Sequence, residues 1–171
     1  MRGGIWVLTI FAAIWGALGV LGAGMPPLLA AVPVAVSIAL FFWATRQPSA
    51  PVPEAEQARI GRLVGIWSAV EGVAIFAGVT VCQNIGAAHA IPPVIAIIVG
   101  LHFLPLARGI PVSAYYGTAL ALIATGVGVL LWLPPSHQLP ATGWLAAVIL
   151  WVSCVELVSA PGRGIVDRDS D

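Results

Sequence analysis

Charge is scarce in this sequence. Charged residues make up 8% of the 171 positions, and lysine is absent, so all seven basic residues are arginines. Because an ordinary soluble domain is about 25% charged, this chain cannot cover a soluble fold with charged side chains. Its 60% hydrophobic content also excludes intrinsic disorder. The lack of lysine excludes Schiff-base chemistry and a P-loop, and the net charge of zero gives no basic excess for binding nucleic acid.

Catalytic motifs are missing too. The sequence has no G-x-S-x-G elbow, no H-E-x-x-H pair, no glycine-rich nucleotide loop and no C-x-x-C pair. We therefore expect no cofactor, and we favour a non-enzymatic role over catalysis.

Long apolar runs are what the sequence has instead. Residues 3–45 carry no charge, residues 63–107 carry only Glu71, and residues 109–162 carry only Glu156. A membrane-spanning helix needs about 20 mostly apolar residues, so each run is long enough for two helices and a short turn. We predict an all-α integral membrane protein with six transmembrane helices arranged as three hairpins. The predicted helices cover residues 5–21, 26–45, 63–82, 91–107, 112–133 and 142–160.

The arginines indicate how these helices are oriented. In a six-helix arrangement every arginine falls at the same end of the bundle, whereas five or seven helices would scatter them over both ends. Positive residues stay on the cytoplasmic side of a membrane. We therefore predict a multi-pass protein of the cell membrane, embedded in the lipid bilayer, with both termini in the cytoplasm. The seven residues are Arg2, Arg46, Arg59, Arg62, Arg108, Arg163 and Arg168.

Two short segments are polar enough to lie outside the membrane. Residues 46–62 form a linker between the second and third helices, and its three prolines favour an extended backbone. Residues 161–171 form a short charged tail. We predict a single six-helix membrane domain over residues 1–160, which includes the linker, and no separate soluble domain. The apolar run after Arg2 is long for a cleaved signal peptide, so we interpret it as a retained first helix.

Glu71 is the first candidate for a functional residue. It follows Arg62 by nine residues, which places it about 13 Å deep, near the middle of a hydrocarbon core about 30 Å thick. An ionised carboxylate costs about 2.5–3.5 kcal/mol there. Glu71 should therefore face the bundle interior, where Ser68 can donate a hydrogen bond to it. We favour a functional role over a neutral Glu71 that only bonds a neighbouring helix.

His102 is the second candidate. It lies six residues before Arg108, about 9 Å from the same boundary. Pro105 cannot donate a hydrogen bond to the carbonyl of Leu101, so we expect the helix to bend beside His102. A histidine at a bend suits a proton-handling site or a gate. It suits equally well a neutral imidazole that bonds backbone groups freed by the proline.

Glu156 is the third ionisable residue within a predicted helix. It lies seven residues before Arg163, about 10 Å deep. Ser153 and Ser159 flank it at a spacing of three residues, so the three side chains form one polar face. We favour the interpretation that Glu156 is interfacial and is neutralised by neighbouring arginines.

The similar depths of Glu71, His102 and Glu156 allow these three side chains to meet. Such a cluster could relay protons, or hold a metal ion if the ligand distances closed to about 2 Å. Tyr115 and Tyr116 begin the fifth helix at the same end and could complete a pocket, although a tyrosine pair more often anchors a helix at the membrane interface.

Metal binding at the opposite end is a weaker hypothesis. Cys82, His89 and His137 are the candidate ligands there, but their spacing matches no zinc motif, so we expect no metal. Cys82 and Cys154 lie at different depths and are therefore not expected to form a disulfide.

Small residues mark the expected helix contacts, because lipid gives no hydrophobic drive for helix association. These small-residue faces suit packing within the chain and equally suit a homo-oligomer. They consist of Ala12 and Gly16 in the first helix, and of Gly117, Ala121, Thr125 and Gly128 in the fifth.

Three functions remain open. The leading hypothesis is a proton-linked transporter or channel-like protein for a small solute, because an intramembrane carboxylate and a histidine suit proton coupling. The alternatives are an intramembrane enzyme acting on a lipid or apolar substrate, and a non-catalytic accessory or assembly protein whose polar groups only fix helix packing.

Overall fold

Over the residues that it describes, the structure is a bundle of six α-helices and two short 3₁₀ helices. The computed structural model describes residues 2–47, 53–110, 112 and 114–159, so Arg163, Arg168 and the tail lie outside the described residues. Within these described ranges, six helical segments are long and apolar enough to cross a membrane, which supports the predicted all-α class and suggests a multi-pass membrane protein. The helices are α1 (Arg2–Gly22), η1 (Pro27–Ala30), α2 (Ala31–Arg46), α3 (Glu54–Asn84), η2 (Ala88–Ala90), α4 (Ile91–Gly109), α5 (Ala114–Trp132) and α6 (Pro135–Ser159).

Two helices, α3 and α6, begin much earlier than predicted. α3 starts at Glu54, nine residues before position 63, because the last linker proline is Pro53 and the residues after it favour helix. Glu54 and Glu56 also place negative charge in the first turn, where it interacts favourably with the helix dipole. α6 starts at Pro135, seven residues before position 142, since proline is well tolerated at the first helical position. The second half of the predicted linker is therefore an extension of α3.

The first two hairpins turn in the same way. Each turn contains a glycine with positive φ, +66° at Gly24 and +72° at Gly86, a conformation that other residues rarely adopt. A 3₁₀ helix, η1 or η2, follows each glycine and leads directly into the returning α-helix. The α1–α2 and α3–α4 hairpins therefore share one local design.

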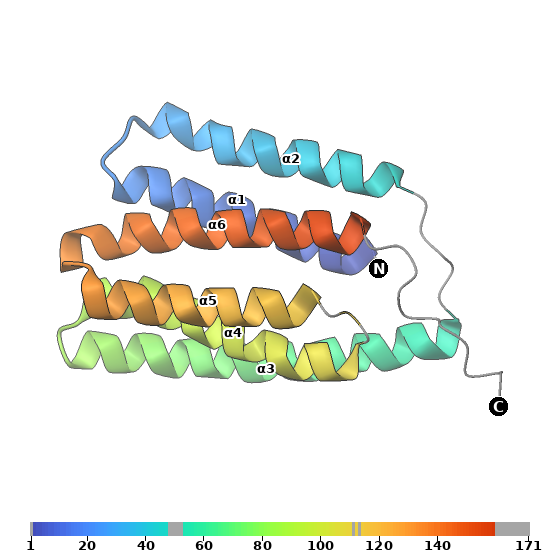
Figure 1. Ribbon diagram of the computed structural model, residues 1–171. Helices are drawn as coiled ribbons and strands as arrows, with labels where there is room; N and C mark the ends of the chain where they lie inside the picture. Colours follow the sequence, from blue (N-terminus) through green and yellow to red (C-terminus); the bar gives the residue numbers. More distant parts are fainter. Residues whose placement is uncertain (1, 48–52, 111, 113, 160–171) are drawn as a thin grey trace.

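The helices pack side by side in an order that differs from their order in the chain (Figure 1). The main contacts link α2 to α1, α1 to α6, α6 to α5, α5 to α4, and α4 to α3. α2 and α3 therefore lie at the two edges of the bundle. Arg46 and Arg108 occupy the last turns of α2 and α4, and Arg59 lies near the start of α3. We call this end of the bundle the arginine end, and the end with the glycine turns the turn end.

Glycines allow the central helices to approach each other closely. A Cβ atom on Gly143 of α6 would lie 2.6 Å from the backbone nitrogen of Gly19 in α1, and 2.7 Å from the carbonyl oxygen of Trp15. A Cβ atom on Gly100 of α4 would lie 2.8 Å from the carbonyl oxygen of Ala119 in α5. The α1–α6 and α4–α5 contacts are the most extensive in the bundle, so backbone approach at glycine organises its centre.

The small-residue face predicted for α1 packs within the chain. Ala12 is fully buried, and a Cβ on Gly16 would collide with the side chain of Pro33 in α2. On the face predicted for α5, neither glycine lies close to another helix. A Cβ on Gly117 would find no neighbouring atom within 4 Å, and one on Gly128 would meet only Trp132 of its own helix. α5 instead buries Thr118, Ala119, Leu122, Gly126 and Val129.

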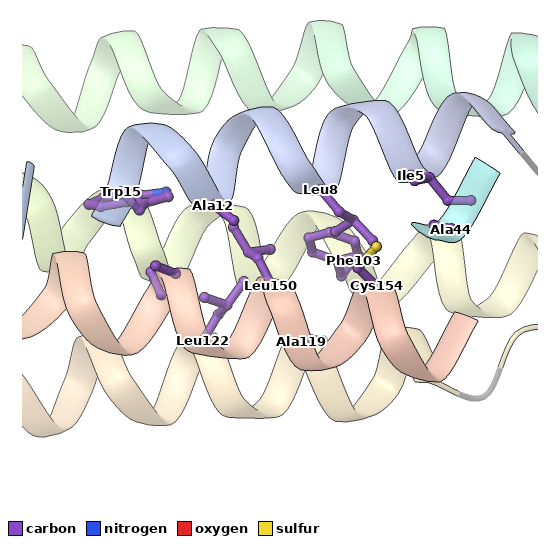
Figure 2. Packing of buried hydrophobic residues seen from close by; sticks show 12 residues of the cluster. Ile5, Leu8, Ala12, Trp15, Ala44, Phe103, Ala119, Leu122, Leu150 and Cys154 are labelled. Carbon is purple, nitrogen blue, oxygen red and sulfur yellow. The ribbon is translucent and has the colours of Figure 1, made fainter. Parts of the chain in front are cut away.

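A continuous apolar core fills the space between α1, α6, α5 and α4. One buried cluster contains Leu8 and Trp15 of α1, Leu150 of α6 and Phe103 of α4 (Figure 2). Leu122 of α5 closes the core and is 1% exposed. By contrast, the most apolar 18-residue stretch of α3 has no buried residue. The edge helix α3 therefore contributes little to this core.

Candidate functional site

Glu71 and His102 meet at the contact between α3 and α4. Glu71 lies close to the middle of α3, and His102 lies about two turns before the end of α4. The Oε2 atom of Glu71 is 3.6 Å from the Nδ1 atom of His102. The Glu71 side chain is 20% exposed and that of His102 is 9% exposed. The structure thus brings the two leading sequence candidates together, at the edge of the bundle and not in its centre.

A backbone contact determines the tautomer of His102. Its Nδ1 atom lies 3.1 Å from the carbonyl oxygen of Trp67, one turn before Glu71 on α3. A carbonyl oxygen can only accept a hydrogen bond, so Nδ1 carries a proton and donates it. The Nε2 atom has no hydrogen-bond partner among the described residues. Proton exchange at the imidazole can therefore occur at Nε2 while Nδ1 keeps the ring fixed.

The chain continues as α-helix through Pro105, so the proline beside His102 does not end α4. α4 continues to Gly109, whose carbonyl accepts a hydrogen bond of 2.9 Å from the Nη2 atom of Arg59. This contact gives a partner to one of the carbonyls that a helix end leaves free. Arg59 also makes two hydrogen bonds to Glu56, of 2.6 and 2.8 Å. α3 is therefore fastened to α4 at the arginine end as well as at His102.

Ser68 and Glu156 stand apart from the pair. Ser68 is exposed, and the described residues include no hydrogen bond between it and Glu71. Ser68 precedes Glu71 by three residues, but Glu71 contacts His102 of α4 whereas Ser68 stays exposed. Glu156 is exposed on α6, and the structure does not bring it to Glu71 and His102. Within the described ranges no group of three acidic, histidine or cysteine side chains could hold a metal ion.

The remaining candidate residues at the arginine end do not contact Glu71 or His102 in the described interactions. Tyr115 packs against Phe103 with ring centroids 5.6 Å apart, whereas Tyr116 is exposed, so the two tyrosines do not share a pocket. Ser153 is buried, and its Oγ atom lies 2.6 Å from the Oγ1 atom of Thr118, which links α6 to α5. Ser153 therefore belongs to a helix contact, while Glu156 on the same predicted face does not.

The candidates at the turn end are dispersed. Cys82 is buried in α3, His89 is exposed in η2, and the Nδ1 atom of His137 lies 3.1 Å from the hydroxyl of Ser136. Cys82 and Cys154 are both free, as their different depths predicted.

Sequence reasoning missed several buried polar residues. The indole nitrogen of Trp151 donates a hydrogen bond of 2.9 Å to the hydroxyl of Ser37, which links α6 to α2. Gln138 is 4% exposed, and its Oε1 atom is buried without a partner among the described residues. Ser37 is the only serine in an otherwise apolar stretch of the second helix, and that isolation was the available signal.

Comparison with known proteins identifies no relative. No protein-family model, no curated protein and no solved structure matches this chain. The function must therefore be argued from the residues themselves.

Proposed function

We propose that this protein is a small multi-pass membrane protein that couples movement of a small solute to protons, and that Glu71 and His102 form its proton-binding pair. The observation that carries the proposal is their contact at 3.6 Å, midway along a helix apolar enough to span a bilayer. Ionisable groups at such a depth are costly, and they characteristically mark ion and proton pathways. Each member of the pair can bind and release a proton, Glu71 at its carboxylate oxygens and His102 at Nε2.

The pair lies where one helix, α3, can move relative to the rest of the bundle. α3 lies at the edge of the bundle, and its extensive contacts are with α4 and η2. A displacement of α3 along α4 would break the His102–Trp67 and Arg59–Gly109 hydrogen bonds and change the Glu71–His102 distance, while leaving the α1–α6 and α4–α5 contacts intact. Protonation could thus be linked to movement of one helix and not to rearrangement of the core.

The proposal includes an orientation. Four arginines of α2, α3 and α4 lie at the arginine end. They are Arg46, Arg59, Arg62 and Arg108. The positive-inside rule then puts this end, and both chain termini, on the cytoplasmic side of the cell membrane.

One contact in the same site supports an alternative function without transport. The His102–Trp67 hydrogen bond ties α4 to the backbone of α3, as a purely structural histidine would. This contact favours an accessory or assembly protein in which the polar pair only fixes helix packing.

Proton flux separates the two functions. We would reconstitute the protein into liposomes with an internal pH dye, impose a membrane potential, and add small amines, amino acids and organic acids one at a time. We expect Glu71→Gln to abolish proton entry, and Glu156→Gln, a matched change at an exposed carboxylate of α6, to leave it unchanged. Flux no greater than that of empty liposomes for every solute would refute transport. A folded Glu71→Gln variant with normal flux would refute the role of the pair.

A further inference from the structure

A shallow hollow lies along α3 near the arginine end. Its volume is about 490 Å³, and every described residue that lines it belongs to α3. The backbone positions recur at three- and four-residue spacing, so they form one face of the helix. The lining residues are Ala55, Ala58, Arg59, Arg62, Leu63 and Ile66.

The hollow carries one uncompensated positive charge. Arg59 is already committed, because its guanidinium bonds both carboxylate oxygens of Glu56 and the carbonyl of Gly109. Arg62 is exposed, and within the described part of the chain no residue pairs with it. Arg62 follows Arg59 by three residues, so the two guanidinium groups lie on the same side of the helix. Guanidinium groups bind phosphate oxygens well, because their N–H groups form a planar fork.

The face of α3 above Arg62 is apolar and uncovered. A Cβ atom at Gly65 or Gly72 would find no neighbouring atom within 4 Å. Val73 and Phe76 are 70% and 75% exposed. Ten residues of helix, from Arg62 to Gly72, cover about 15 Å, which matches one leaflet of a hydrocarbon core about 30 Å thick. One end of this face is charged and the rest is apolar. These two regions correspond to the headgroup and the acyl chains of a phospholipid.

We propose that this face of α3 binds one anionic phospholipid. Its phosphate contacts Arg62 and the exposed side of Arg59, and its acyl chains lie along the apolar face toward Phe76. Charge complementarity selects this occupant. A second copy of the chain, packed in parallel on the same face, would bring two uncompensated Arg62 side chains to the same level. This inference requires the chain to lie in a bilayer, but it does not depend on the transport proposal.

The site can be tested by native mass spectrometry of the full chain in detergent. We would titrate the protein with phosphatidylglycerol and, separately, with phosphatidylcholine of the same acyl chains. We expect one phosphatidylglycerol to bind tightly and phosphatidylcholine to bind weakly. Arg62→Gln should weaken phosphatidylglycerol binding at least about tenfold, as expected for the loss of one charge-assisted hydrogen bond. Arg62 has no partner to lose among the described residues, so this variant should fold normally.

Arg46→Gln is the matched control, because Arg46 is also exposed at the arginine end but lies on α2. This variant should keep its lipid affinity within about twofold, a small change in binding free energy. An equal loss in both variants would show general electrostatic attraction and refute the site. Equal binding of the two lipids would refute the charge argument. Competition by inorganic phosphate at the lipid's own concentration would show a phosphate site without acyl contacts, and a dimer without bound lipid would show that a second copy covers the face. Either result would overturn the proposal.

Discussion

Replacing Gly143 with alanine tests whether the close approach of α1 and α6 holds the bundle together. The added methyl group would lie 2.6 Å from the backbone nitrogen and Cα of Gly19 and 2.7 Å from the carbonyl oxygen of Trp15. All three atoms belong to the α1 backbone, which cannot rotate away as a side chain can. α1 and α6 must therefore separate, or the local helix geometry must change.

The magnitude follows from the separation required. Ordinary van der Waals contact begins at 3.4 Å, so a contact at 2.6 Å requires a shift of 0.8 Å. A gap of this size removes about a quarter to a half of the dispersion energy of the atom pairs it separates. For a surface equivalent to one buried leucine, with some 40–60 atom pairs of about 0.1–0.2 kcal/mol each, the loss is about 1–6 kcal/mol. The usual cost of overpacking a core, about 1–3 kcal/mol, lies in the lower half of this range, and we take about 2 kcal/mol from it.

Gly117→Ala provides the matched control. Alanine has a higher helix propensity than glycine by about 1 kcal/mol, and both variants receive this gain. A Cβ on Gly117 meets no neighbouring atom within 4 Å, so this variant has no clash. We therefore expect the free energy of unfolding of Gly143→Ala to lie about 2 kcal/mol below that of Gly117→Ala. The measurement is reversible unfolding in mixed micelles, followed by tryptophan fluorescence. Equal stability of the two variants would refute the packing described for α1 and α6.

Three further changes test other parts of the structure. Trp151→Phe should lower the free energy of unfolding by about 1 kcal/mol through loss of the hydrogen bond to Ser37, whereas Trp132→Phe, at a residue that is 77% exposed, should change it far less in the same unfolding assay. A reporter enzyme fused after His137 should be active outside the cell, and activity only in the cytoplasm would contradict the proposed orientation. Cys154 is fully buried, so a membrane-permeant maleimide should modify it only after unfolding, and rapid labelling of the folded protein would contradict the described core.

The number of helices was predictable because it depends on few features. Three long runs with at most one charge each set the six helices, and turns rich in proline or glycine divided each run in two. Helix ends were less predictable. The start of α3 at Glu54 lies among charged residues, and hydropathy does not register a helix that extends beyond the apolar run. The physical signal was the end of the prolines at Pro53, followed by good helix formers.

The rotation of each helix was not predictable. Along α5, small residues recur on more than one face, and the structure buries the face of Thr118 and Gly126 instead of that of Gly117. Hydropathy does not distinguish these faces, because a residue can be apolar toward lipid or toward protein at nearly equal cost. The choice follows from which backbone can approach a partner helix, which depends on two helices at once.

For the candidate site, too, the depth of each residue in the membrane was predictable from the sequence, whereas the direction of its side chain was not. Arginine spacing placed Glu71 and His102 at comparable depths, and they do lie in contact. It placed Glu156 at a comparable depth too, yet Glu156 is exposed on α6. Depth can be counted from one sequence, whereas the partner of a side chain depends on the order of helices. Here α4 lies between α3 and the remainder of the bundle, which separates Glu71 from α6.

The packing makes Glu71 an informative residue to change. The contacts that organise the bundle are the glycine approaches of α1 to α6 and of α4 to α5, and Glu71 takes part in neither. The hydrogen bond from His102 to Trp67 and the one from Arg59 to Gly109 hold α3 on α4 without the carboxylate. Glu71→Gln keeps the size of the side chain, removes its capacity to ionise and replaces one carboxylate oxygen with an NH₂ group. A folded Glu71→Gln protein is therefore the expected result, and any change in its proton flux would report on the chemistry of the carboxylate and not on the stability of the fold.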